Sequence, residues 1–171
     1  MGRLFDCVSA LVMRRTHITY DAQAAIELER AIEPDVTDFY SYSIDEKEEK
    51  LEIGYEEILS GILRDVKDEK TASYISAKFH NTVCEATIEG VCNIRNRCGI
   101  NNIVLSGGVF ENAYLLKNMK RGLKECGFNT YHNMNIPAND GGIAFGQVVA
   151  AAQMAKEGNY VSGSSGKNCN H

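Results

Sequence analysis

The sequence predicts an α/β fold, a short mixed sheet flanked by helices, and two observations carry that prediction. In the last third of the chain, a short apolar run at 102–106 and a second predicted strand at 128–132 are each followed by a helical stretch. The order strand, helix, strand, helix predicts two parallel strands joined by a right-handed crossover. The first two thirds consist mainly of segments whose apolar residues recur every three or four positions, which is the helical period.

The first predicted helix covers residues 3–13, because its apolar residues fall on one helical face. Residues 16–20 are β-prone and predict an extended connector. Asp21 is placed to cap a second helix that runs to about residue 31, and Pro34 ends it because proline cannot continue a helix. The residues of the first helix expected to face the core are Leu4, Phe5, Val8, Leu11 and Val12.

A β-hairpin is predicted next. Residues 39–44 are aromatic and β-branched, residues 51–53 form the second strand, and the charged stretch between them is expected to be an exposed turn. Two helices follow, at 55–66 and 71–97, with a glycine at position 99 suited to the C-terminal cap of the second. Beyond the first parallel strand, helices are expected at about 112–126 and 143–156.

Composition argues against several classes of protein. The net charge of −5 is unfavourable for nucleic-acid binding through phosphates, which needs a basic face. No run of about 18 apolar residues is present to span a membrane, and the N-terminus lacks a signal-peptide cleavage pattern. The six cysteines form no CxxC pair and no zinc-site spacing, which is typical of reduced thiols. We therefore expect a cytoplasmic protein with no membrane or nucleic-acid partner.

The strongest local feature is LSGGVFEN at 105–112, where a buried strand ends in Gly107 and Gly108 and opens onto a helix. Glycine lets the backbone approach a ligand closely, and helix N-terminal N–H groups favour anions. A phosphate or nucleotide could therefore bind outside the carboxyl end of this strand. The motif is neither a Walker loop nor a GxGxxG fingerprint. The spacing by itself is equally typical of an ordinary tight strand-to-helix turn.

A second loop, PANDGG at 137–142, follows the other parallel strand. Its Asp140 could bind a metal ion or cap the next helix, and spacing alone favours capping. Both loops follow neighbouring parallel strands, so both should open on the same edge of the sheet and form one site. His80 is interpreted as a structural hydrogen-bonding residue rather than a ligand. Asp6, in the first helix, is on spacing alone equally typical of a solvated side chain.

Read together, several motifs resemble the C-terminal end of the hydrogenase maturation carbamoyltransferases of the HypF family, and more distantly the TsaD-type tRNA threonylcarbamoyl transferases. The likeness covers the chain up to about residue 147, in the right order. Its motifs are GRLFD at 2–6, YDAQAAIELE at 20–29, FHNTV at 79–83, LSGGVFEN at 105–112 and PANDGGIAFGQ at 137–147.

The resemblance implies an actin-like ATPase fold of the ASKHA, ribonuclease H-like type. Residues 1–157 would be the C-terminal lobe of the Kae-like domain, and residues 158–171, which are poor in apolar side chains, a flexible tail. HypF proteins use carbamoyl phosphate and ATP to form carbamoyl-adenylate. They then transfer the carbamoyl group to the C-terminal cysteine of HypE, which supplies the cyanide ligands of NiFe-hydrogenases. The alternatives are a TsaD-like lobe and a non-catalytic nucleotide-binding module.

The resemblance also implies roles for particular residues, although it assigns no catalytic residue. Asp140 would be a ligand of a divalent metal ion, whose identity the sequence does not indicate. The nucleotide-binding residues would be Asp6 and, as a weaker ribose contact, Glu27, together with Gly107, Gly108 and Asn112.

Two departures from the family pattern affect these expectations. The chain has YDAQAA where the family usually has YEGQAA, so Ala22 replaces a glycine that lies near the nucleotide. The HxxxH metal pair of the family's first lobe has no counterpart here. The isolated chain is therefore not expected to catalyse the full reaction.

Overall fold

The computed structural model describes residues 1–15, 17–47 and 50–156. The expected tail at 158–171 lies outside these residues. The strands are β1 (Ile44–Lys47), β2 (Lys50–Ile53), β3 (Asn102–Leu105) and β4 (Asn129–His132). The helices are α1 (Gly2–Met13), α2 (Gln23–Arg30), α3 (Glu56–Lys67), α4 (Ala72–Cys98), the short 3₁₀ helix η1 (Gly108–Glu111), α5 (Ala113–Glu125) and α6 (Gly141–Lys156).

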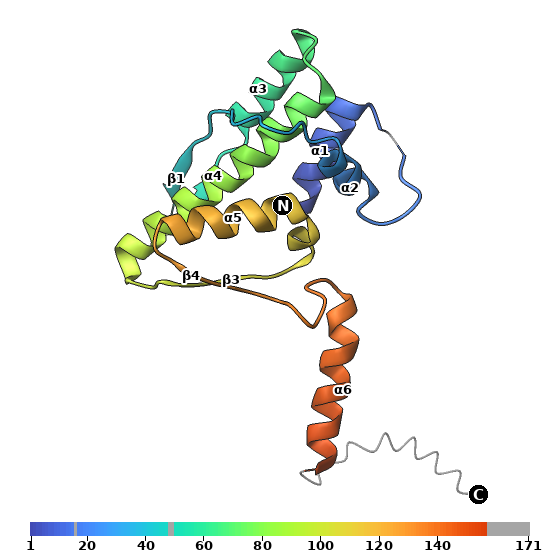
Figure 1. Cartoon of the computed structure of the whole chain (residues 1–171), viewed down its shortest axis with the longest axis vertical. Coiled ribbons are helices and arrows are strands. Elements are labelled where there is room, and N and C mark those ends of the chain that lie inside the picture. The colour runs from blue at the N-terminus through green and yellow to red at the C-terminus, as the bar shows by residue number, and fades with distance from the viewer. Residues whose placement is uncertain (16, 48–49, 157–171) are drawn as a thin grey trace, which may run out of the picture.

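Two separate pairs of strands make up the sheets of the described chain. β1 and β2 form an antiparallel hairpin, as expected, but the charged residues 45–47 and 50, expected to be an exposed turn, belong to its strands. β3 and β4 are parallel, with Asn102 opposite Asn129 and Leu105 opposite His132, and α5 makes the crossover between them (Figure 1). The prediction of a parallel pair is therefore confirmed. Since the strands run in register, the loops that follow them leave from the same end of the pair.

The 27-residue helix α4 is the centre of the core, and the sequence predicted both of its ends. The hydroxyl oxygen of Thr71 accepts a hydrogen bond from the N–H of Tyr74 at 3.2 Å, and Gly99 ends the helix with a φ of 70°. Helices α1, α2, α3 and α5 pack around α4. The largest fully buried apolar side chains are Phe5, Val8, Leu28, Ile62, Ile75, Phe79, Leu115 and Leu123.

The prediction of a strand beginning at residue 39 is wrong, because β1 begins only at Ile44. Side chains of α4 bind the backbone groups that a strand would offer to a neighbour. The hydroxyl of Thr82 accepts from the N–H of Tyr40 at 2.8 Å, and the amide of Asn81 donates to the carbonyl of Asp38 at 3.0 Å. Residues 39–43 therefore run along α4 as an irregular segment.

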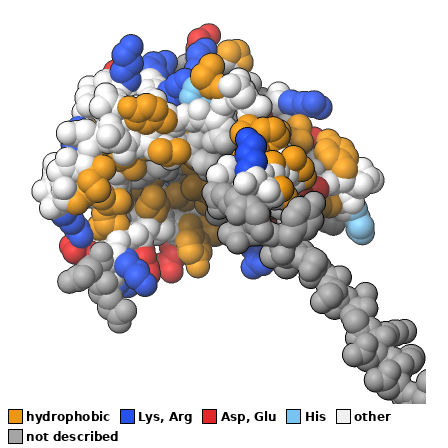
Figure 2. All heavy atoms as spheres, turned by 90° about the horizontal axis from the view of Figure 1, so that it is seen from below, with side chains coloured by type: hydrophobic (Ala, Val, Ile, Leu, Met, Phe, Trp, Pro, Cys, Tyr) orange, Lys and Arg blue, Asp and Glu red, His pale blue; other side chains and the backbone are white. Residues whose placement is uncertain are grey.

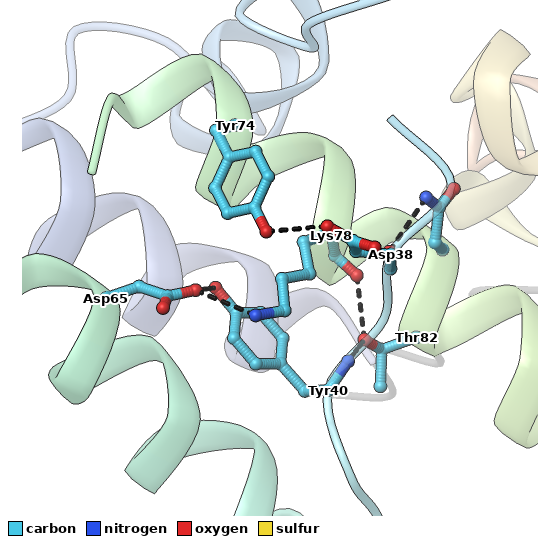
Figure 3. A network of polar contacts seen from close by, with 7 residues as sticks. Asp38, Tyr40, Asp65, Tyr74, Lys78 and Thr82 are labelled. Atoms are coloured by element: carbon cyan, nitrogen blue, oxygen red, sulfur yellow. Dashed lines mark hydrogen bonds and ion pairs between the residues drawn. The ribbon is translucent and has the colours of Figure 1, made fainter. Parts of the chain in front are cut away.

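A buried polar network fixes this segment to α3 and α4 (Figure 3). The Tyr40 hydroxyl donates to the Asp65 carboxylate at 2.8 Å, and the Lys78 ammonium lies 3.0 Å from the same oxygen. Lys78 also lies over the Tyr40 ring, 4.3 Å from its centre. The polar residue Asp65 is buried in α3, whereas the apolar Leu63 of the same helix is exposed.

The start of α2 also differs from the prediction. Its N-cap is Ala22, in the left-handed region with a φ of 59°, and no side chain caps the helix. The Asp21 carboxylate instead accepts from the N–H of the next residue at 3.0 Å. The expected connector at 16–20 is not a strand where it is described, at 17–20. In α1, Phe5 and Val8 are buried as predicted, whereas Leu11 is exposed.

Helix α6 has no buried residue and extends away from the other helices (Figure 1). The outer face of the β3–β4 pair is also exposed to solvent, since Val104 and Tyr131 are 69% and 56% exposed. Orange apolar side chains are visible on this face when it is seen from below (Figure 2). No described helix is long and apolar enough to cross a membrane. The described cysteines are all free thiols.

Candidate functional site

The glycine loop after β3 has the open backbone that a ligand site needs. Gly107 has a φ of 97°, a conformation that strains any residue with a side chain. A Cβ atom built on Gly107 would have no atom within 4 Å, so this stretch of backbone faces open space. Gly108 begins η1, which leads through Asn112 into α5. A ligand can therefore approach the main chain here without meeting a side chain.

The loop that carries Asp140 meets the glycine loop. A Cβ atom on Gly108 would lie 3.7 Å from the Cβ of Asn139. Asn139 also forms the local turn at the start of α6, because its side-chain oxygen accepts from the N–H of Gly141 at 2.9 Å. Within the described residues, the exposed Asp140 carboxylate makes no hydrogen bond or ion pair. The capping interpretation therefore fits Asn139, and Asp140 is left available to a ligand.

The Asn112 side chain is held from two sides. Its oxygen accepts from the N–H of Leu115 at 2.9 Å and so caps α5. Its amide nitrogen lies 3.0 Å from Nε2 of His80, and Nδ1 of His80 lies 2.7 Å from the carbonyl oxygen of Ser76. His80 is fully buried, and burial lowers its pKa to about 4. The structural interpretation of His80 made from the sequence agrees with this environment.

The start of α5 already holds a carboxylate that sequence reasoning missed. Glu29 of α2 accepts a hydrogen bond from the N–H of Tyr114 at 3.2 Å, in the first turn of α5. An acidic group at this end of a helix is stabilised by the helix dipole. The Tyr114 hydroxyl in turn donates to Asn81 of α4 at 2.6 Å. A phosphate would therefore meet negative charge at α5, and the glycine backbone is the better place for it.

The two acidic residues assigned to the nucleotide ribose lie in different surroundings. Asp6 is exposed on α1 and follows Phe5, whose ring lies 5.3 Å from the His80 ring. The contact to His80 is made by Phe5 and not by Asp6 itself. Glu27 forms an ion pair with Arg15 and accepts from Gln23 at 2.8 Å. Two positions along a helix point roughly 200° apart, so Glu27 faces away from the α5 contact of Glu29.

The structure thus brings Gly108 against the loop of Asp140, with Gly107 just before it and Asn112 at the end of η1. It leaves Asp6 exposed on α1 and Glu27 apart, paired with Arg15. Glu27 lines a separate hollow of about 360 Å³ with Met13, Arg14, Arg15 and His17. The described residues contain no group of three or more His, Cys, Asp or Glu side chains able to hold a metal ion. Asp140 fits a metal site only as one ligand among others that the described chain does not supply.

Comparison with known proteins places this arrangement in a class. Residues 1–147 match the family described as "Carbamoyltransferase, Kae1-like Domain, second subdomain". The chain is 35% identical over 154 residues to the carbamoyltransferase HypF of Synechocystis sp., covering 90% of this chain and 19% of that protein. It is 32% identical over 158 residues to a probable carbamoyltransferase HypF of Methanocaldococcus jannaschii, covering 87% and 19%. The chain belongs to the HypF carbamoyltransferase family and spans about a fifth of the length of these relatives.

Solved structures agree with this assignment. A crystal structure of full-length HypF in the phosphate- and nucleotide-bound form matches 94% of this chain and 21% of its own, with a TM-score of 0.81 and 42% identity. A crystal structure of HypF from T. kodakarensis matches 92% of this chain and 20% of its own, with a TM-score of 0.70 and 21% identity, a likeness of fold alone. The expected fold, a Kae1-like α/β lobe with short sheets, is confirmed.

Proposed function

We propose that this chain is the nucleotide-facing second lobe of a HypF-type carbamoyltransferase. The observation that carries the proposal is the meeting of the glycine loop with the loop of Asp140, at the carboxyl end of the parallel pair. Ligands in open α/β sheets bind at this end of the strands. The structure of a 42% identical HypF was obtained with phosphate and nucleotide bound, which supports ATP as the ligand.

In the proposed reaction, carbamoyl phosphate is hydrolysed to carbamate and phosphate, and the carbamate oxygen attacks the α-phosphate of ATP to give carbamoyl-adenylate and pyrophosphate. The acceptor is the C-terminal cysteine of HypE. The cysteine sulfur forms a bond to the carbamoyl carbon, the bond from that carbon to the AMP phosphate oxygen breaks, and the thiol loses its proton. The open backbone of Gly107 and Gly108 would lie along the phosphates, and the Asn112 amide would fix the nucleotide by hydrogen bonds. Dehydration of the carbamoyl group then leads to the cyanide ligands of NiFe-hydrogenase.

Asp140 would contribute one carboxylate oxygen to a divalent metal ion. Carboxylate oxygen is a common ligand of such ions, and the exposed Asp140 side chain is not committed to the helix that follows it. The remaining ligands would come from the histidine pair of the first lobe. The ion would neutralise and orient phosphate oxygens when bound.

The apolar surface around α6 would be covered by the first lobe of the same domain. The family description names this part a second subdomain, and about four-fifths of each curated relative lies outside the match. Apolar side chains are exposed both on the outer face of β3 and β4 and along α6, and exposed apolar surface of this kind is typical of an interface. Its exposed residues include Val104, Tyr131, Met134, Ile143, Phe145, Val148 and Val149.

Carbamoyl transfer in the full-length protein tests this function. The protein would be incubated with ATP, carbamoyl phosphate and HypE, and carbamoylated HypE measured by mass spectrometry. Gly107→Ala should abolish most transfer, since the new methyl group points into the space reserved for the ligand.

The matched control is Gly127→Ala. Gly127 also has positive φ, at 80°, and also has no atom within 4 Å of a built Cβ, but it lies at the far end of α5. Both changes put a side chain at positive φ, and the strain is greater at Gly107, whose ψ is 160°. The melting temperature of each variant is therefore measured beside its transfer activity. Equal loss of transfer in the two variants would refute the glycine-loop site, and transfer to a different acceptor in place of HypE would refute the proposed reaction.

A further inference from the structure

We propose that His80 is a positioning residue that holds the Asn112 side-chain amide in one orientation for the nucleotide. This inference rests on the proposed function, because it takes Asn112 to be a nucleotide contact. The juxtaposition that supports it is a continuous chain of hydrogen bonds from α4 to the start of α5. It comprises Ser76, His80, Asn112 and Leu115.

Each hydrogen bond in this chain fixes the direction of the next. The Ser76 carbonyl can only accept, so Nδ1 of His80 carries the ring proton. Nε2 of the neutral ring is then an acceptor and binds the amide nitrogen of Asn112. The Asn112 oxygen is turned toward the N–H of Leu115. A flipped amide would place its oxygen against the lone pair of His80 and its NH₂ group against a backbone N–H.

The amide of Asn112 keeps part of its hydrogen-bonding capacity for a ligand. An asparagine side chain can donate two hydrogen bonds and accept two, and the chain of bonds uses one of each. Asn112 is half-buried rather than fully enclosed, and its second N–H and second lone pair would be the groups that bind the nucleotide. Fixing the amide in advance spares the nucleotide the entropic cost of ordering it.

His80 lies among aromatic rings, where an apolar side chain would pack equally well, so its hydrogen bonds are what distinguish it. Its ring lies 5.3 Å from Phe5, 5.8 Å from Phe79 and 5.7 Å from Tyr114, all edge-on. An apolar residue would fill this aromatic space without the cost of burying polar atoms. Both ring nitrogens are hydrogen bonded, so the buried polarity is satisfied. Of the two hydrogen bonds of the His80 ring, the one to Ser76 stays within α4 and the one to Asn112 leads out of it.

The test compares His80→Leu with His80→Gln in the full-length protein. Leucine fills the space but cannot accept a hydrogen bond, whereas the glutamine side-chain oxygen can. His80→Leu should raise the KM for ATP about tenfold, the effect of losing one oriented hydrogen bond, and His80→Gln should restore most of the affinity. In an Asn112→Ala background, His80→Leu should have no further effect on KM.

Thr82→Val is the matched control for lost stability. Thr82 is also a buried polar residue of α4, and its hydroxyl accepts from Tyr40 rather than from the site. The control should lower the melting temperature and leave the KM for ATP unchanged. A rise in KM in Thr82→Val equal to that in His80→Leu would overturn the positioning role, and so would an unchanged KM in His80→Leu.

Crystal structures of the two His80 variants separate this inference from the proposed function. The Asn112 amide should lose its single orientation in His80→Leu and keep it in His80→Gln. An unchanged amide in His80→Leu would overturn the inference whatever the protein binds. If Asn112→Ala alone leaves the KM for ATP unchanged, the failure lies in the proposed nucleotide role of Asn112, and the inference falls with it.

Discussion

Tyr40 and Tyr74 provide a matched test of how burial strengthens one kind of hydrogen bond. Each phenol donates to a carboxylate, Tyr40 to Asp65 at 2.8 Å and Tyr74 to Asp38 at 2.7 Å (Figure 3). The bonds are alike in chemistry and length but differ in solvent access. Tyr40 is 3% exposed and Asp65 8% exposed, whereas the Tyr74 bond is solvent-exposed. Replacement of each tyrosine by phenylalanine removes only the hydroxyl group.

Tyr40→Phe should destabilise the fold by about 2 kcal/mol, because a hydrogen bond to a charged group contributes about 1.5–3 kcal/mol. Lys78 stays 3.0 Å from the Asp65 carboxylate in this variant, so the charge is not left unpaired, and the loss stays within that range. Tyr74→Phe should cost less than about 1 kcal/mol, since water replaces an exposed donor. For a chain of this size, the melting temperatures should fall by about 4–8 °C and less than about 4 °C, respectively.

The assay is thermal and urea unfolding of both variants beside the wild type. Burial, followed by the bond to Asp65, raises the pKa of Tyr40 well above its ordinary value. A raised folded-state pKa stabilises the protein fully below about pH 10 and progressively less above it, as the unfolded phenol ionises first. The stability difference between wild type and Tyr40→Phe should therefore narrow above about pH 10. Equal losses in the two variants at neutral pH would refute the argument from burial.

Four further predictions follow from other sites. Ala22→Gly should stabilise the chain by about 1 kcal/mol in urea unfolding, because the φ of 59° strains alanine. His80 has a lowered pKa of about 4, so its contribution to stability is lost as pH falls from about 6.5 to 4, and His80→Gln should flatten this part of the stability profile. Asp140→Asn should leave the melting temperature unchanged, since Asn139 forms the turn at α6, but should lower metal content and carbamoyl transfer at least about tenfold in the full-length protein. The isolated chain should bind ATP only at roughly millimolar to high micromolar concentration in calorimetry, because half a cleft offers fewer contacts.

Helix ends and strand order depend mainly on residues close together in the sequence, so both could be predicted from it. The ends of α4 follow from Thr71 and Gly99, whose capping roles depend only on the adjacent backbone. The parallel pair follows from the order of the two strand segments and the helix between them. The motif spacing also predicted that the glycine loop and the Asp140 loop would meet, since strands in parallel register end at one edge.

Features set by contacts distant in the sequence could not be predicted in the same way. The aromatic residues at 39–43 have the composition of a strand, but Thr82, 42 positions away, binds the N–H of Tyr40, and Asn81 binds the carbonyl of Asp38 just before the segment. Helical period predicted an apolar face for α3 but gave no sign that Asp65 would lie inside it, paired with Lys78. The apolar residues of α6 and of the outer sheet face are exposed in the described chain, and the helical and strand periods of these segments gave no sign of that exposure.

Glu29 shows how one such contact changes the interpretation of a motif. The glycine motif followed by a helix predicted a phosphate at the helix N-terminus, where N–H groups and the dipole favour an anion. The carboxylate of Glu29 already bonds to the N–H of Tyr114 there, and Asn112 takes the N–H of Leu115. Adding phosphate at the same place would bring like charges together. The anion is better accommodated by the backbone at Gly107, where a built Cβ meets no atom and the facing Asp140 loop could hold a cation between them.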